Sequence, residues 1–112
     1  MPSHATENDN ISKSNSVIML LLDPYIEKSI QDYFKDKSVL DHFGNPTALQ
    51  AALYDAKINE ITKIDNEFSY RVNITVPIFY GAHIPYGLET MVFSVRTGGN
   101  IVLESYTHKA TT

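Results

Sequence analysis

The sequence of 112 residues has no cysteine and no tryptophan. Without cysteine the chain has no disulfide framework, no thiol nucleophile and no thiolate ligand for a metal ion. Long hydrophobic runs are missing as well, and the run Val17–Leu22 is far shorter than the roughly 20 apolar residues that span a bilayer. The sequence therefore excludes a disulfide-stapled miniprotein and a thiol enzyme, and it predicts no transmembrane segment.

Positive charge is also scarce, with 9 lysine and arginine residues against 13 aspartate and glutamate residues and a formal net charge of −4. Nucleic-acid binding depends on clustered cations that neutralise phosphates, so this balance argues against a nucleic-acid partner. The content of hydrophobic residues, 43%, is enough for one core, and the length is that of one domain. We therefore expect a single folded domain over residues 16–112.

The first 15 residues offer little for a core to bury, since Ala5 and Ile11 are their only apolar side chains besides Met1. Ordering such a segment costs about 1–2 kcal/mol per residue with little burial to offset it, which predicts a flexible tail over residues 1–15. The same stretch is mixed and partly acidic, so it does not form an intact signal peptide. A signal peptide removed earlier remains compatible with the sequence.

The segment after the tail has the spacing of an amphipathic helix. Ser16 is a typical helix N-cap, and Asp23 followed by Pro24 repeats that signal. The pattern predicts a helix over about 16–36, either straight or kinked where Pro24 lacks a backbone donor. Its apolar face is formed by Ile26, Ile30, Tyr33 and Phe34, and Val17, Leu20, Leu21 and Leu22 are expected to bury its first part.

From residue 54 onward the sequence changes to the two-residue period of strands. The longest such stretch alternates six apolar residues with other residues between Phe68 and Ile78. Turn residues separate it from its neighbours, including a Gly-Gly pair that supplies the positive φ of a tight hairpin. The expected strands are 54–64, 68–78, 88–96 and 101–108, joined by turns at 65–67, 80–87 and 97–100.

The predicted pairings of the last two strands place apolar residues on one face of a sheet. A two-residue turn at Gly98-Gly99 sets Glu89 opposite His108 and Phe93 opposite Glu104. A slip by one residue would destroy the agreement between the strands, because it would move every side chain to the other face.

The two middle strands place their apolar residues on the same face when the loop at 80–87 sets Ile78 opposite Glu89. Ile61 is the misfit, since it points outward unless a β-bulge turns it inward. The fold class is therefore α+β, with an N-terminal helix packed on a four-stranded antiparallel meander. This shape resembles cystatin-like and nuclear-transport-factor-like folds.

Polar side chains also fall on the inner face in this register. Buried carboxylates and imidazoles are unfavourable unless paired, so they indicate either a polar cleft between helix and sheet or a sheet end open to water. In a cleft, His108 or His83 can act as a base that Glu89 orients. The polar residues of this group are Glu89, Glu104, Tyr106 and His108.

The segment 80–87 is aromatic and is bounded by glycines. Long loops at the end of a sheet carry function more often than their scaffold does, so Tyr80, His83 and Tyr86 are candidates for a recognition surface. The alternative is a loop tucked over the end of the core, with Pro85 fixing its path.

The sequence predicts no metal site and no cofactor. The four histidines, among them His4 and His42, are scattered without the spacing of metal ligands. A site built from His83, His108 and Glu89 is conceivable but has no ligand motif. The chain also has no glycine-rich phosphate loop and no nucleophile elbow.

Three stretches, Leu20–Ile30, Tyr54–Ile58 and Gly81–Gly87, resemble a family of short Bacillus-type proteins that is known as a domain of unknown function. The most specific stretch is the Gly-x-His-x-Pro-Tyr-Gly segment, and the likeness covers roughly residues 17–108. The resemblance implies a bacterial protein that is secreted or held in the cell envelope, with the cytoplasm as the alternative. It implies no activity.

Two classes of function remain open. The first is a small non-enzymatic binding or interaction module, whose partner is a protein or a small molecule. Its candidate contact residues are Tyr80, His83, Tyr86, Tyr106 and Glu104. The second is a small cleft enzyme that uses His108 and Glu89. In either case the chain is a monomer or a homodimer, the latter formed through the sheet face or an edge strand.

Overall fold

The computed structural model describes residues 3–64 and 68–111. These residues form an α+β fold with one helix and an antiparallel sheet of five strands, so the predicted class is confirmed and the predicted number of strands was one too small. The elements are helix α1 (Ser3–Phe34), strand β1 (Gln50–Ala51), the 3-10 helix η1 (Leu53–Asp55), and strands β2 (Lys57–Lys63), β3 (Tyr70–Tyr80), β4 (Ile84–Arg96) and β5 (Asn100–Ala110).

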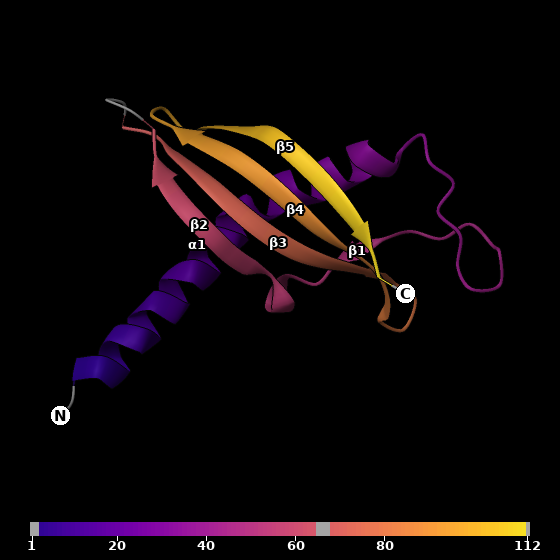
Figure 1. Ribbon diagram of the computed structural model, residues 1–112, viewed down its shortest axis with the longest axis horizontal. Coiled ribbons are helices and arrows are strands. Elements are labelled where there is room, and N and C mark those ends of the chain that lie inside the picture. The colour runs from indigo at the N-terminus through magenta and orange to yellow at the C-terminus, as the bar shows by residue number, and fades with distance from the viewer. Residues whose placement is uncertain (1–2, 65–67, 112) are drawn as a thin grey trace.

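The sheet has the order β1–β3–β4–β5, and β2 pairs with β3 on the same side as β1 (Figure 1). Strand β2 pairs with the first half of β3, whereas β1 pairs with residues 78 and 79 near its end. Strand β1 is the strand that the sequence did not predict. It has only two residues, too few to show an alternation of apolar and polar side chains.

Helix α1 lies across one face of this sheet, which we call the inner face (Figure 1). Ile26 of the helix and Ile74 and Met91 of the sheet are fully buried between the two layers. Each such side chain contributes about 1.5–3 kcal/mol of burial free energy, so this contact fixes the helix on the sheet. The core consists of Met19, Leu22, Ile26, Ile30 and Phe34 against Val72, Ile74, Val76, Ile78, Met91 and Phe93.

The helix begins at Ser3, not near Ser16, and it continues through Pro24. The backbone of residues 3–15, predicted as a tail, is therefore helical, and it projects beyond the sheet (Figure 1). Extending a helix that packing has already nucleated adds one hydrogen bond per residue, so a segment without a core-facing stripe can still join it. The predicted flexibility of this segment stays a prediction, and residues 1–2 lie outside the described residues.

The turn between β3 and β4 is shorter than predicted. It consists of Gly81–His83, and most of the predicted loop at 80–87 belongs to the two strands. As a result Glu89 lies opposite Val76, not opposite Ile78. The predicted and observed registers differ by two residues, an even number, so every side chain keeps its predicted face.

The bulge expected near Ile61 is present, because the register of β2 shifts between Ile58 and Glu60. Ile61 then lies opposite Val72, on the inner face. The misfit in the sequence pattern was therefore a correct indication of a bulge. The turn predicted at 65–67 lies outside the described residues.

A second bulge changes the register in one half of the predicted hairpin of β4 and β5. Glu89 lies opposite His108, as predicted, but the register shifts between Val92 and Phe93, and Phe93 lies opposite Leu103. The prediction that Glu104 faces Phe93 was wrong, because Glu104 is the extra residue of the bulge. The turn at the other end has three residues between Arg96 and Asn100.

Candidate functional site

Glu89 of β4 forms the centre of a buried polar cluster on the inner face. Its carboxylate is completely shielded from solvent. The Tyr106 hydroxyl donates a hydrogen bond to Oε1 at 2.8 Å, and the Nδ1 of His108 lies 2.7 Å from Oε2 and 2.9 Å from Oε1. Two side chains of β5 thus satisfy both oxygens of the buried carboxylate.

Aromatic rings cover this cluster. The ring of Tyr33 stacks on Tyr106 with centroids 4.3 Å apart, and the ring of Phe34 meets His108 edge-on at 5.2 Å. Tyr86 also stacks on His108, with ring centroids 5.9 Å apart. The last turn of α1 therefore supplies two of the three rings. The side chain of His108 keeps 20% of its surface exposed, whereas that of Glu89 has none.

Gly87 makes room for the imidazole. A Cβ atom at this position would lie 2.6 Å from Cε1 of His108 and 2.8 Å from Oε2 of Glu89. Both distances are shorter than van der Waals contact, so only glycine allows the observed packing. The sequence presented Gly87 as the boundary of a loop, but the structure shows it as a contact of the polar cluster.

Burial is the main influence on the protonation of this cluster. It raises the pKa of Glu89 above its ordinary value of 4.5, against the opposing effect of the hydrogen bonds from His108 and Tyr106. Burial, followed by the hydrogen bond to the carboxylate, also raises the pKa of Tyr106, so the phenol stays protonated and remains a donor.

A carboxylate on Nδ1 of a histidine is the arrangement that orients a general base, because it leaves Nε2 to exchange protons. Proton transfer also requires space for a substrate next to that nitrogen. Among the described residues, four pockets of about 150 to 700 Å³ are lined by other side chains, and neither Glu89 nor His108 lines any of these four. The rings of Tyr33, Phe34 and Tyr86 pack against the pair, so the cluster joins β5 to the end of α1.

The structure separates the three predicted contact residues of the 80–87 segment. Tyr80 is buried, with its hydroxyl 3.3 Å from Nδ1 of His42, and its ring lies 6.3 Å from that of Tyr86. His83 instead occupies the exposed turn and stacks on Phe79 at 4.5 Å. Tyr80 and Tyr86 therefore belong to the covered end of the core, and only His83 is exposed. A binding role for any of the three stays a prediction.

Glu104 lies on the opposite, outer face of the sheet. The Nε of Arg71 donates a hydrogen bond to its Oε2 at 2.7 Å. The predicted grouping of Glu104 with Glu89 and His108 was therefore wrong, because the bulge in β5 turns this residue outward.

An exposed apolar surface on α1 was missed by the sequence reasoning. The exposed fractions of Val17, Leu20, Leu21 and Tyr25 are 54%, 67%, 66% and 37%. We call these four residues the helix stripe. Only Leu22 of the leucines in this run is buried, so the prediction that the whole run packs on the sheet was wrong. The sequence did indicate such a surface, because the run 17–22 is apolar on every side of the helix and one sheet can cover only one side.

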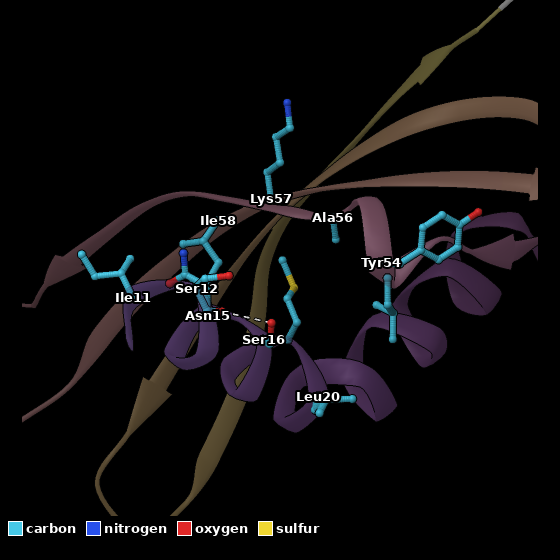
Figure 2. Close-up of a pocket in the computed structure, with 11 residues that line it drawn as sticks. Ile11, Ser12, Asn15, Ser16, Leu20, Tyr54, Ala56, Lys57 and Ile58 are labelled. Atoms are coloured by element: carbon cyan, nitrogen blue, oxygen red, sulfur yellow. Dashed lines mark hydrogen bonds between the residues drawn. The ribbon is translucent and has the colours of Figure 1, made fainter. Parts of the chain in front are cut away.

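Two pockets lie on either side of the helix stripe. The larger, of about 700 Å³, lies between α1 and the segment 53–58, and the polar side chains of Ser12, Asn15 and Ser16 line part of it (Figure 2). The smaller, of about 340 Å³, lies on the sheet end near β2 and β5, and we call it the apolar pocket. Its lining consists of Ile18, Leu21, Leu22, Ile61, Tyr70, Val72, Val95 and Ile101.

Residues 3–64 and 68–111 contain no helix that is long and apolar enough to cross a membrane. They also contain no group of three or more histidine, aspartate or glutamate side chains arranged to hold a metal ion.

A family model described as "Protein of unknown function (DUF3888)" matches residues 14–109. The match begins within α1 and ends in β5, so it covers every strand in Figure 1. No curated protein and no solved structure matches the chain. The likeness to cystatin-like or nuclear-transport-factor-like folds accordingly remains an expectation from the sequence.

Proposed function

We propose that this chain, which belongs to the DUF3888 family, is a non-enzymatic binding module that takes an apolar partner on helix α1. The observation that carries the proposal is the helix stripe beside the apolar pocket. The stripe leaves four large apolar side chains in water, and Leu21 belongs both to the stripe and to the pocket lining.

The size of this surface supports a role in binding. From their exposed fractions, the four stripe residues present on the order of 500 Å² of surface, which equals the largest patches of ordinary monomers, and such patches are often functional. Covering that area would yield roughly 10 kcal/mol of burial free energy before the entropic losses of association. A partner that buries an equal apolar area of its own raises the gain to roughly 20 kcal/mol, which exceeds the cost of association.

The chemistry of the apolar pocket indicates what kind of group enters it. Its volume of about 340 Å³ is in the range of ligand sites, but its lining contains no charged side chain. Binding there depends on burial of apolar surface, so the pocket suits an alkyl or aromatic group, such as a hydrophobic side chain of a partner protein.

The second candidate, a small cleft enzyme, is favoured by one observation only, the contact of His108 with the buried carboxylate of Glu89. Against it, the rings of Tyr33, Phe34 and Tyr86 pack on His108 and leave only 20% of its side chain exposed. We therefore rank binding above catalysis. Binding of a small polar ligand that is lost in His108→Gln and retained in the Leu21→Asp variant would reverse this order.

We also propose that the module acts in the cell envelope or outside the cell. The support is the resemblance of residues 20–30, 54–58 and 81–87 to secreted or envelope proteins of Bacillus type. Fractionation of cells that express the natural gene tests this point. Recovery of the protein in the cytoplasm alone would contradict it.

The main experiment uses N-phenyl-1-naphthylamine, an uncharged fluorophore whose emission rises in apolar surroundings. We expect saturable binding to the wild type and at least a tenfold weaker affinity in the double variant Leu21→Asp, Ile61→Lys, because both side chains border the apolar pocket. Phe43→Asp is the matched control, since Phe43 is also apolar and exposed but lies outside the pocket. Equal binding by all three proteins would refute the proposal.

A further inference from the structure

We infer that the partner on the helix stripe is the stripe of a second copy of this chain, packed helix against helix about a twofold axis. This inference rests on the proposed function and names its partner. It makes the protein a homodimer through α1, whereas the sequence had pointed to the sheet face or an edge strand.

The spacing of the stripe suits contact with itself. Val17, Leu21 and Tyr25 are four residues apart and form one ridge along the helix, with Leu20 beside it. Ridges of this kind interdigitate between two helices that cross at about −50°, the commonest packing class. A twofold axis requires that the same patch serve both copies, and a ridge centred on Leu20 and Leu21 meets that condition.

The charges near the stripe are compatible with this packing. None of the four stripe residues is charged, and Lys28, one turn beyond them, forms an ion pair with Asp32 at 2.8 Å. At a −50° crossing the two helices diverge away from the axis, so the lysines of the two copies separate by more than the Debye length of about 8 Å. Repulsion between the copies is therefore weak.

The available area predicts a reversible dimer. The stripe offers on the order of 500 Å² per copy, so the contact buries about 1,000 Å² in total, more than most crystal-packing contacts and slightly less than a standard interface. Interfaces below about 1,200 Å² are typical of weak, transient contacts, so we expect a dissociation constant on the order of micromolar. Residues 10–16 of α1, which are also exposed, would add to the contact.

Other occupants of the stripe are less well supported. The formal net charge of −4 opposes adsorption to an anionic lipid surface. Self-association through the edge strand β5 is opposed by its own structure. The bulge at Glu104 interrupts the ladder, and an irregular, charged edge is a poor template for another strand.

Sedimentation velocity over a range of about 1 to 200 μM provides the first test, because the range spans the expected dissociation constant. We expect the wild type to change from monomer to dimer and the double variant Leu20→Asp, Leu21→Asp to stay monomeric at every concentration. The control Phe43→Asp should dimerise like the wild type, because Phe43 lies outside the stripe. Far-UV circular dichroism verifies that each variant is folded.

Disulfide trapping provides a second test that does not disrupt the interface. The chain has no cysteine, so each single-cysteine variant reports one position alone. Leu20→Cys lies near the proposed axis and should cross-link quickly under mild oxidation, since cross-linking requires Cα atoms about 4.4–6.8 Å apart. Phe43→Cys should cross-link slowly. Fast trapping of Ser105→Cys in β5, with none at residue 20, would overturn the inference in favour of an edge-strand dimer.

The outcomes separate this inference from the proposed function. A wild type that stays monomeric at 200 μM but binds N-phenyl-1-naphthylamine overturns the dimer and leaves the binding module standing. A monomer that co-sediments with vesicles of phosphatidylglycerol also overturns the second copy, in favour of a lipid surface. Dimerisation that persists in the Leu20→Asp, Leu21→Asp variant would place the interface elsewhere and refute the inference.

Discussion

Replacing Gly87 with alanine should destabilise the protein, although alanine is the more favourable residue in an extended strand. Gly87 lies inside β4, and it is not among the glycines that have a positive φ. Judged by backbone entropy alone, the substitution would stabilise the fold by about 0.4–1 kcal/mol. The expected loss of stability therefore has to come from the contacts of this residue with His108 and Glu89.

The size of the loss follows from the geometry of the polar cluster. A Cβ atom 2.6 Å from Cε1 of His108 forces the imidazole away from Gly87 and from the Glu89 carboxylate, which is 2.7 Å from its Nδ1. A fully buried carboxylate that loses a charge-assisted hydrogen bond costs about 2–4 kcal/mol. After the entropic gain is subtracted, the free energy of unfolding should fall by about 1–3 kcal/mol.

A double-mutant cycle distinguishes this cause from a general packing defect. Urea denaturation, followed by circular dichroism and tyrosine fluorescence, gives the free energy of unfolding of the wild type, Gly87→Ala, His108→Ala and the double variant. In the His108→Ala background the added methyl group no longer displaces an imidazole, so its effect should shrink by at least 1 kcal/mol. A Gly87→Ala protein as stable as the wild type, or equal effects in both backgrounds, would refute the reasoning.

Three further predictions concern the rest of the fold. Burial raises the pKa of Glu89 above 4.5, so the folded protein binds the proton of this carboxyl group more tightly than the unfolded chain does. The contribution of the protonated group to stability is therefore full below pH 4.5 and declines as the pH rises through the folded-state pKa. Urea melts at several pH values above 4.5 should show a steeper decline in the wild type than in Glu89→Gln, which keeps only the smaller contribution of groups such as Glu27. Ile30→Ala should lower the free energy of unfolding by about 2–4 kcal/mol and its exposed neighbour Gln31→Ala by less than about 0.5 kcal/mol, measured in the same assay. Glu104→Gln should leave N-phenyl-1-naphthylamine binding unchanged, since Glu104 pairs with Arg71 on the outer face, and a large loss of binding would contradict that placement.

Part of the candidate site could be predicted from the sequence. The pairing of Glu89 with His108 followed from the hairpin turn, because an error of one residue in the turn was compensated by a bulge before the strands reached that pair. The position of Glu104 could not be predicted, since it lies at the bulge itself. A bulge adds one residue to one strand and leaves no regular signal in the local pattern.

What the sequence determined by itself was the inner face of the sheet. A period of two residues assigns each side chain to a face, and a shift of the register by an even number, as between Val76 and Ile78, leaves that assignment unchanged. The same local logic marked Ile61 as a misfit and so indicated the bulge in β2.

Only the tertiary structure decided which apolar residues stay exposed and which strand position must be glycine. In a run that is apolar on every side of the helix, the spacing cannot tell Leu21 from Leu22, and the distinction comes from where the sheet lies. The contact of Gly87 with His108 likewise depends on the pairing of β4 with β5, which brings together residues that are far apart in the sequence. Local periodicity specifies faces, whereas burial and close approach depend on what the rest of the chain places against them.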